Sequence, residues 1–290
     1  MFSYYAMKLL SHLICILPYP AAMALGEGLA RLAWHFIPTR RKTLAGEQVM
    51  RCLGVSAAEA ERIARASSLR FGPMLMEVLR YPVMQPHMSD YVTLTGAVEE
   101  VRAAVAVGKG AIFATSHSGN WELMGGAFAS SGLPVVGVAK RQSSRGMDRF
   151  INEYRTLVGM HVTYRSGVRE MFRMIGEGWI IGLISDQDPA LRDGIIIDFF
   201  GQPTNAFTGA AAIARRCEVP IFPVFIHREA DGHHIITVEH GITVEKTDDR
   251  AADVRRTTQI VNSRIEAWIR KYPEEWFWLH DRWKSLREEQ

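Results

Sequence analysis

The residues best suited to chemistry lie between 116 and 122, in the run Ser-His-Ser-Gly-Asn-Trp-Glu. His117 can serve as a general base, because an imidazole exchanges protons near neutral pH. Glu122 follows five residues later, across a turn that contains Gly119 and Asn120. Such a turn can fold the carboxylate back onto the imidazole, where it would fix the tautomer and stabilise the imidazolium. The spacing also allows a plainer interpretation, a loop histidine followed by an acid at a helix N-terminus.

This run contains no obvious protein nucleophile. Ser116 occupies the first glycine position of a Gly-x-Ser-x-Gly elbow, which makes a serine hydrolase a weak interpretation. The patterns GxxxxGK[ST], GxGxxG and HExxH do not occur in the sequence. If the hydroxyl of a substrate attacks an activated thioester directly, the reaction needs no nucleophile from the protein.

Other polar residues follow predicted elements. Asp186 and Asp188 come after an apolar run at 179–185, so we expect them at a sheet edge near the same site. They could position a substrate, pair with an arginine or serve only the structure, and no third ligand accompanies them to suggest a metal. Thr208 begins a helix, and capping of that helix is favoured over a polar contact at the mouth of the site.

These residues must be positioned by an alternating series of strands and helices. The predicted strands are 111–115, 134–139, 161–164, 179–185, 195–200 and 221–226, with a further short strand within 86–96 and an exposed strand pair over 234–245. The predicted helices are 120–130, 146–158, 167–176, 206–217 and 250–271. The alternation predicts an α/β domain whose sheet is covered on both faces. His117 would then lie outside the carboxyl end of a buried strand, where active sites of open α/β sheets are found.

The N-terminal segment is apolar. Residues 9–26 contain no Asp, Glu, Lys or Arg, but Pro18 and Pro20 must interrupt a helix there. We expect a retained hairpin-like or interfacial membrane element, and the basic residues at 40–42 suit the cytoplasmic face of an anionic membrane. A signal peptide and a plain buried helix pair are the alternatives.

A long helix is predicted over 56–80. Ser56 stands three residues before Glu59, which is the spacing of a capping box. Because the sequence contains no repeat or obvious linker, the simplest partition is a helical N-terminal segment at 1–85 and a catalytic domain at 86–290.

Composition limits the class of protein. The 290 residues are 48% hydrophobic and 22% charged, which is typical of a globular chain. A formal net charge of +3 gives no electrostatic case for binding nucleic acid. Three widely separated cysteines argue against a disulfide framework or a cysteine zinc site, and they favour a reducing compartment. The adjacent His233 and His234 are expected at the surface, since neighbouring strand residues point in opposite directions.

The spacing from His117 to Glu122 resembles the HX4D/E motif of glycerolipid acyltransferases, and the fuller HSGNWE form resembles the lipid A biosynthesis lauroyl/myristoyl acyltransferase family. Further blocks resemble that family in the expected order. They are Leu17-Pro18 with Gly26-Glu27-Gly28, Ala139-Lys140-Arg141, Arg155 with Gly159, Ser185-Asp186-Gln187-Asp188, Phe199-Phe200-Gly201, Thr208-Gly209, and the ending P-x-x-W-x-W-x-H-x-R-W-K at 273–284. The resemblance covers most of the chain, although the asparagine-leucine pair that often follows the family's basic cluster is missing.

The resemblance implies an α/β enzyme with a glycerolipid-acyltransferase-like mixed sheet flanked by helices. It implies transfer of a fatty acyl chain from acyl carrier protein to a hydroxyl of a lipid A precursor or related glycolipid, at the cytoplasmic face of the inner membrane. His117 would deprotonate the hydroxyl, and Glu122 would orient and stabilise His117. The amide N–H groups near Gly119 and Asn120 are candidates for stabilising the oxyanion. No metal, cofactor or nucleic acid is implied.

The same resemblance places further residues near the substrates. Asn120, Asp186 and Thr208 are expected to contact substrate, and Arg141 and Arg155 to lie near the acceptor, where a guanidinium can bind phosphate through two hydrogen bonds. A surface salt bridge is the alternative for the arginines. Three tryptophans near the C-terminus suit a membrane interface or the core: Trp276, Trp278 and Trp283.

Two other functions stay open. The first is a related acyltransferase that uses acyl-CoA and acts on another glycolipid, such as a phosphatidylinositol mannoside, or on a lysophospholipid. The second is a catalytically silent lipid-binding relative, against which the intact His117 and Glu122 argue.

Overall fold

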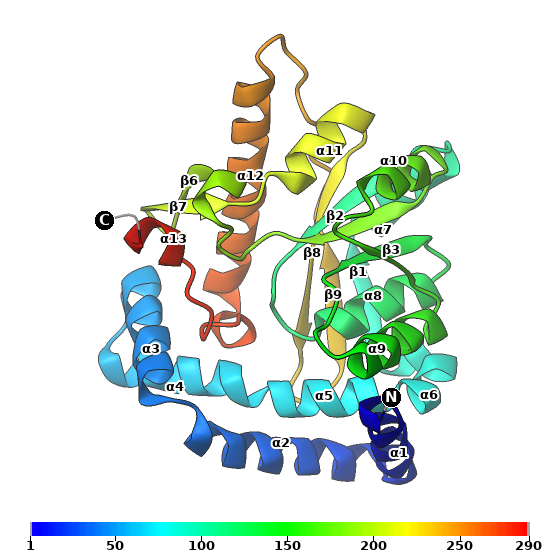
Figure 1. The fold of residues 1–290 in the computed structure, drawn as a ribbon, viewed down its shortest axis with the longest axis vertical. Coiled ribbons are helices and arrows are strands. Elements are labelled where there is room, and N and C mark those ends of the chain that lie inside the picture. The colour runs from blue at the N-terminus through cyan, green and yellow to red at the C-terminus, as the bar shows by residue number, and fades with distance from the viewer. Residues whose placement is uncertain (1, 289–290) are drawn as a thin grey trace.

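A seven-stranded mixed sheet forms the centre of the computed structural model, which describes residues 2–288 (Figure 1). The strand order is β1-β9-β8-β2-β5-β3-β4, and neighbours are parallel except for the antiparallel pair β8 and β9. The strands are β1 (Val92–Gly96), β2 (Ala111–Thr115), β3 (Val135–Ala139), β4 (His161–Tyr164), β5 (Ile180–Ile184), β8 (Ile221–Arg228) and β9 (His234–Val238). This confirms the predicted mixed α/β architecture.

Different helices cover the two faces of the sheet. On β2, Phe113 packs into the core on one face, and Ile112 and Ala114 pack into the core on the other, as the two-residue period of a strand requires. The first face is covered by α8 (Trp121–Ser130) and α9 (Arg145–Leu157), and the second by α10 (Val168–Gly176), α11 (Gly209–Cys217) and α12 (Arg250–Lys271). The remaining helices after the first strand are α7 (Val98–Ala106), η2 (Leu191–Asp193), η3 (Pro273–Glu275) and α13 (Lys284–Arg287).

Two strand predictions need correction. The pair predicted over 234–245 is wrong: β9 ends at Val238, and beyond it Ile242 makes only an isolated bridge to Ile221. A small hairpin of β6 (Ile195–Phe199) and β7 (Gln202–Ala206) stands apart from the main sheet. The sequence of β7 escaped prediction because its polar residues and proline lack the alternation typical of a strand.

Within the described residues, a series of helices precedes the first strand. They are α1 (Phe2–Ile16), α2 (Tyr19–Phe36), α3 (Thr39–Leu53), α4 (Ala57–Leu69), α5 (Phe71–Leu79), α6 (Tyr81–Met84) and η1 (Gln85–Asp90). As predicted, the first helix breaks before Pro18, and Ser56 caps α4 by accepting the Glu59 amide at 3.3 Å. The single helix predicted over 56–80 is wrong, because it divides at Arg70, where the Pro73 nitrogen has no hydrogen to donate to the preceding turn. The partition at residue 85 stays a prediction.

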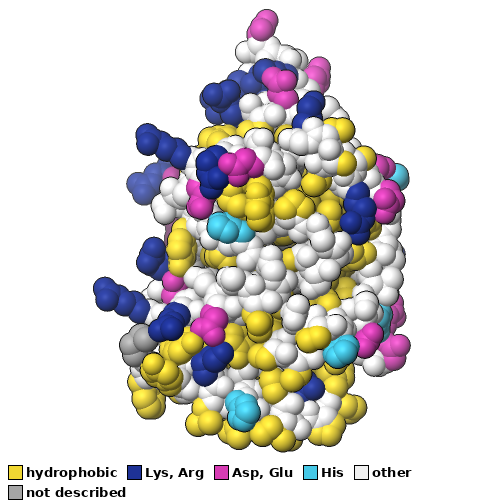
Figure 2. Space-filling view, turned by 90° about the vertical axis from the view of Figure 1, so that its right-hand side faces the viewer, with side chains coloured by type: hydrophobic (Ala, Val, Ile, Leu, Met, Phe, Trp, Pro, Cys, Tyr) yellow, Lys and Arg dark blue, Asp and Glu magenta, His cyan; other side chains and the backbone are white. Residues whose placement is uncertain are grey.

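α1 and α2 carry an apolar surface. Figure 2 shows hydrophobic side chains gathered at the lower end of the molecule, where Figure 1 places these two helices. Large exposed side chains on them are Phe2, Tyr5, Leu9, Leu10, Leu13, Ile16, Leu25, Leu29, Leu32 and Phe36. This exposure argues against a plain buried helix pair. Across residues 2–288, we find no helix with the length and apolar character needed to span a membrane.

α2 and α5 cross at two glycines. A Cβ atom on Gly72 would overlap the carbonyl oxygen of Gly26, and a Cβ on Gly26 would lie 2.7 Å from the Gly72 oxygen. Both clashes involve backbone, so no side-chain rotation relieves them. The glycine pair therefore sets the separation between α2 and α5, and α5 in turn reaches the candidate site.

We predict that Gly72→Ala lowers the free energy of unfolding by about 1–3 kcal/mol, because the added methyl forces the two helices apart. Denaturant titration measures the loss. Gly28→Ala is the matched control, since a Cβ there meets nothing within 4 Å. The control should be neutral or stabilising by up to about 1 kcal/mol, because alanine favours a helix over glycine. Equal destabilisation by both substitutions would contradict the close crossing.

Candidate active site

Two adjacent parallel strands bring His117 and Asp186 together. Thr115, the last residue of β2, is paired with Ile184, the last residue of β5. His117 and Asp186 each stand two positions beyond their strand, so both side chains emerge at the same sheet edge. His117 Nδ1 lies 2.8 Å from Asp186 Oδ1, and the His117 backbone N–H donates to Asp186 Oδ2 at 2.8 Å.

Asp186 therefore takes the position at the imidazole that was predicted for Glu122. The Glu122 carboxylate instead accepts two hydrogen bonds from Arg155, at 2.9 Å from Nε and 2.6 Å from Nη2. The predicted pairing of Glu122 with His117 is wrong because Trp121, the first residue of α8, is the one that faces the imidazole, with ring centroids 5.0 Å apart. The next residue of a helix points about 100° away, and here it points toward α9.

The Asp186 carboxylate is 1% exposed and well provided with donors. Trp276 Nε1 donates to Oδ2 at 2.7 Å, in addition to the two contacts from His117. Burial by itself raises the pKa of this carboxyl, but the adjacent His117 ring and the hydrogen bonds outweigh burial and lower the pKa to about 2. Since the ionised carboxylate only accepts, the neutral ring carries its hydrogen on Nδ1, which leaves Nε2 as the basic nitrogen.

The C-terminal segment holds the His117 loop from another side. The Gly119 N–H donates to the Glu275 carbonyl at 3.0 Å, and the Phe277 N–H donates to the His117 carbonyl at 3.1 Å. Gly119 has a φ of +59°, and a Cβ there would overlap the Ile226 carbonyl oxygen, so the loop requires glycine. Because the Gly119 amide already has an acceptor, its predicted role toward an oxyanion is wrong.

Two charged residues of the N-terminal helical segment also hold this loop, and neither was predicted. Arg70 donates to the carbonyl oxygens of Gly119 at 2.5 Å and His117 at 3.1 Å, and burial lowers its pKa to about 10. Glu77 Oε2 accepts from Asn120 Nδ2 at 2.7 Å. The signal that could have found Glu77 is its position as the one ionisable residue in the otherwise apolar α5.

Glu77 is 1% exposed and binds groups from several elements. Its Oε1 accepts from Tyr19 Oη at 2.7 Å and contacts His234 Nε2 at 2.9 Å, with Arg228 Nη2 at 3.8 Å. Burial raises the pKa of this carboxyl, but His234 and the other partners outweigh it, so the pKa is lowered. The prediction that His234 lies at the surface is wrong, because β9 is an inner strand and its first residue is 2% exposed beneath α5.

The side chains of the other predicted contact residues bind or pack against groups of the protein itself. The Asn120 side chain is 2% exposed, and its Oδ1 caps α8 by accepting the Leu123 amide at 3.0 Å, so a substrate contact by this side chain is wrong. Arg155 is bound to Glu122 rather than free for a phosphate. The exposed Arg141 guanidinium lies 4.5 Å over the Tyr164 ring.

The structure also tests three further predictions. Thr208 precedes α11 without a side-chain capping bond, so the capping prediction is wrong. Asp188 serves the structure, accepting from the Ser285 amide at 2.6 Å and hydroxyl at 2.7 Å. The C-terminal tryptophans belong to the core rather than to a membrane interface, with exposures of 1%, 0% and 4% for Trp276, Trp278 and Trp283.

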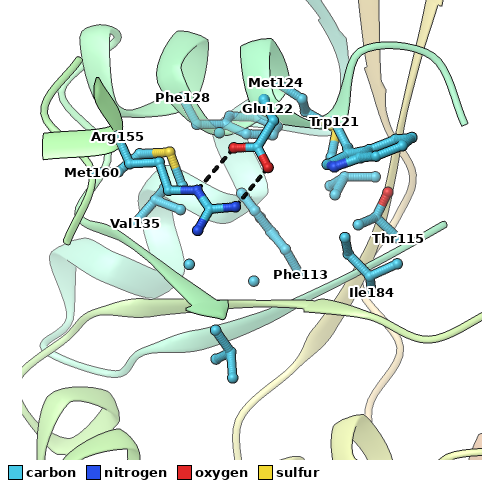
Figure 3. A pocket seen from close by; sticks show the side chains of 15 residues that line it. Phe113, Thr115, Trp121, Glu122, Met124, Phe128, Val135, Arg155, Met160 and Ile184 are labelled. Carbon is cyan, nitrogen blue, oxygen red and sulfur yellow. Dashed lines mark hydrogen bonds and ion pairs between the residues drawn. The ribbon is translucent and has the colours of Figure 1, made fainter. Parts of the chain in front are cut away.

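An apolar pocket opens beside the site, between α8 and the sheet (Figure 3). Its empty volume, counted out to the mouth and including solvent space there, is about 590 Å³. Its polar groups come from Thr115, Glu122 and Arg155. Trp121 forms part of the wall and touches His117, so the pocket and the basic imidazole share one boundary.

Comparison with known proteins decides the family. The model of the bacterial lipid A biosynthesis acyltransferases matches residues 2–285. The chain belongs to this family. It is therefore an acyltransferase, as its resemblance to the family predicted.

The matches to named relatives cover nearly the whole chain. The phosphatidylinositol mannoside acyltransferase of Mycolicibacterium smegmatis is 29% identical over 275 residues, covering 91% of this chain and 86% of that protein. The lipid A biosynthesis lauroyltransferase of Escherichia coli is 22% identical over 278 residues, covering 95% and 89%. The crystal structure of a 1-acyl-sn-glycerophosphate acyltransferase from Thermotoga maritima overlaps 78% of this chain and 94% of that one, with 11% identity and a TM-score of 0.36, a likeness too distant to inform the site.

We predict that Glu122→Ala destabilises the acyltransferase by about 3–5 kcal/mol, because it leaves a largely buried guanidinium unpaired. The side chains of Arg155 and Glu122 are 17% and 14% exposed. The double variant Glu122→Ala/Arg155→Met removes both charges and should recover much of the loss in denaturant titration. A double variant as unstable as the single one would contradict the buried ion pair.

Asp186 should make the stability of the fold sensitive to acid. Its folded pKa of about 2 lies below the ordinary aspartate value of about 3.9, so the ionised form stabilises the folded state. That contribution, about 2 kcal/mol, is complete above roughly pH 4 and is lost as the pH falls toward 2. The difference in unfolding free energy between the wild type and Asp186→Asn should therefore shrink over this range, and a constant difference would contradict the assignment.

Proposed function

We propose that this acyltransferase moves a fatty acyl chain from the thioester of acyl carrier protein to a hydroxyl of a lipid A precursor or a related glycolipid. The observation that carries the proposal is the bond from His117 Nδ1 to the buried Asp186, which orients Nε2 as a base beside an apolar pocket. The family and its named relatives support the reaction class.

In the proposed reaction, His117 Nε2 removes the proton of the acceptor hydroxyl as its oxygen attacks the thioester carbonyl carbon. The new C–O bond gives a tetrahedral oxyanion. Collapse of that intermediate breaks the C–S bond, and the proton on Nε2 passes to the departing thiolate. The products are an ester and a free thiol, and the imidazole is neutral again. Asp186 stabilises the transient imidazolium without taking its proton.

The backbone N–H of Asn120 is the remaining candidate donor to the oxyanion. It lies at the N-terminus of α8, where the helix macrodipole favours negative charge. The Gly119 amide is held by Glu275. The oxyanion would therefore receive one backbone hydrogen bond from this loop, and any further donor would come from the bound substrates.

A phosphatidylinositol mannoside is the alternative acceptor. It is favoured by one specific observation: the relatives with that name are 28–29% identical to this chain, against 20–22% for the relatives named for lipid A biosynthesis. Both acceptors are glycolipids with free hydroxyls, so His117 would do the same chemistry on each. Acyl-CoA is the alternative donor, and a lysophospholipid the alternative acceptor outside the glycolipids.

We propose that the enzyme works at the cytoplasmic face of the inner membrane. The apolar surface of α1 and α2 suits helices that lie within the interface, and Arg40, Arg41 and Lys42 directly follow it. An apolar groove between α2 and α5 continues inward from this surface, lined in part by Leu29, Trp34, Phe71, Leu75 and Phe277.

That groove gives a membrane lipid a route to the base. The Phe71 ring packs edge-on against Phe277 at 5.0 Å and Trp121 at 5.8 Å, and Trp121 in turn contacts His117. An acceptor that keeps its tails in the groove could therefore present a hydroxyl to Nε2, while the donor chain occupies the pocket on the other side of Trp121.

The test compares acyl transfer by the wild type, His117→Ala and Asp186→Asn. Both variants should lose about 10²–10⁴ in kcat with a smaller effect on the KM for the donor, because they remove the base or its correct tautomer. Asp193→Asn, in the exposed loop after β5, is the matched control and should keep the wild-type rate.

The assay offers acyl carrier protein thioester or acyl-CoA with each candidate lipid, and mass spectrometry identifies the product. A wild-type rate in His117→Ala would rule out the mechanism. Transfer from acyl-CoA alone would select the alternative donor. Lipid binding without transfer to any acceptor would favour the silent relative.

A further inference from the structure

We propose that Met160 limits the length of the acyl chain that the enzyme accepts, by closing the far end of the apolar pocket. This inference rests on the proposed function, because it assigns the pocket to the fatty acyl chain of the donor. The argument comes from the way three glycines and one methionine shape the space between α8 and the sheet.

The pocket exists because two glycines stand side by side on the face of the sheet that α8 covers. Gly137 of β3 is in register with Gly182 of β5, and on the other side Gly182 is in register with Phe113 of β2. The layer of side chains therefore has a gap two strands wide. A Cβ on Gly182 would meet only the Val136 carbonyl oxygen, at 3.5 Å, so the space above this strand is open.

Met160 occupies one end of this gap. A Cβ on Gly125 of α8 would lie 2.6 Å from Met160 Cε and Sδ, and a Cβ on Gly137 would lie 3.0 Å from Met160 Cε. The Met160 thioether thus lies between α8 and the sheet. A larger residue at Gly125 or Gly137 would occupy the same space. Figure 3 shows Met160 beside Arg155 and Val135 at one end of the pocket.

The other end of the pocket is the end nearest the chemistry. Figure 3 shows Trp121, Thr115 and Ile184 there, away from Met160. Thr115 stands two residues before His117, and the Trp121 ring touches the imidazole. An acyl chain whose carbonyl lies at His117 Nε2 therefore enters past Trp121, and its methyl end points toward Met160.

A tight turn fixes the place of Met160. Gly159 has a φ of +90° and ends α9, and the Met160 N–H then donates to the Arg155 carbonyl at 3.0 Å. Arg155, which holds Glu122 at the pocket wall, and Met160, which closes the pocket, thus belong to one turn. Because this turn holds the Met160 backbone in place, the length of the Met160 side chain sets the length of the pocket.

Two substitutions should move the length limit in opposite directions. Met160→Ala removes the stop and lengthens the pocket, whereas Gly182→Ala adds a methyl group to open space within it. The preferred chain should become at least two carbons longer in the first variant and shorter in the second, with each preference ratio changing by about tenfold, since one methylene in an apolar pocket discriminates to that extent. The measurement is competition among thioesters with even-numbered chains from octanoyl to stearoyl, read by product mass spectrometry.

Met174→Ala is the matched control. Met174 is 2% exposed on α10, on the opposite face of the sheet, so this substitution removes the same atoms from the core without touching the pocket. Its chain-length profile should match that of the wild type. A wild-type profile in Met160→Ala would overturn the assignment, whatever Gly182→Ala shows. If Met160→Ala does not fold, Met160→Val, which shortens the same side chain, takes its place in the test.

A second readout separates this inference from the proposed reaction. Free fatty acids of graded length should raise the Tm of the wild type up to a limiting length, because a ligand that binds the folded state stabilises it. Met160→Ala should extend that limit and Gly182→Ala should reduce it. A shifted limit in an enzyme that transfers no acyl chain would contradict the proposed function alone, whereas the same limit in Met160→Ala as in the wild type would overturn the role of Met160.

Discussion

The organisation of the site depends on one buried carboxylate, Asp186. A carboxylate without water is unstable unless donors surround it, and this one receives the His117 amide, the His117 ring and the Trp276 indole. Each donor imposes a constraint. The amide fixes the path of the chain after β2, the ring fixes the tautomer, and the indole draws the C-terminal segment across the sheet edge. Solvation of one charge thereby assembles residues far apart in the sequence, and the same bonds leave Nε2 as the basic nitrogen.

Further charges hold the loop that follows. Arg70 donates hydrogen bonds to two carbonyl oxygens of the loop, and Glu77 binds the side chain that caps α8. The ion pair of Glu122 with Arg155 ties the first turn of α8 to α9. Groups that are held in this way need little reorganisation when charge develops during a reaction. The arrangement also links the site to the N-terminal helices, because Arg70 and Glu77 both come from the segment that crosses α2. The proposed membrane surface and the proposed base are thus parts of one packed unit.

Apolar space on both sides of Trp121 completes the arrangement. In the proposed reaction, the pocket beneath α8 takes the donor chain and the groove between α2 and α5 takes the tails of the acceptor. The pocket depends on residues that lack side chains, since Gly137 and Gly182 leave a gap in a layer that otherwise would be filled. The groove depends on a surface that is left uncovered. Neither the pocket nor the groove requires polar contacts with a hydrocarbon chain, which is consistent with discrimination among chains by length alone.

The sequence by itself determined most of the elements and the place of the proposed base. Apolar runs and the position of His117 after one of them predicted a buried strand and a site at its carboxyl end, because these properties depend on neighbours within a few residues. The motif blocks identified the family for the same reason. Only the tertiary structure decided the partners. Asp186 lies beside His117 because β2 and β5 are adjacent in the sheet, although the sequence separates them by three helices and two strands. Glu122 lies close in sequence, but the pitch of α8 turns it toward Arg155. Pairing of strands and the direction of a helical side chain depend on which elements pack together, and local spacing does not specify that.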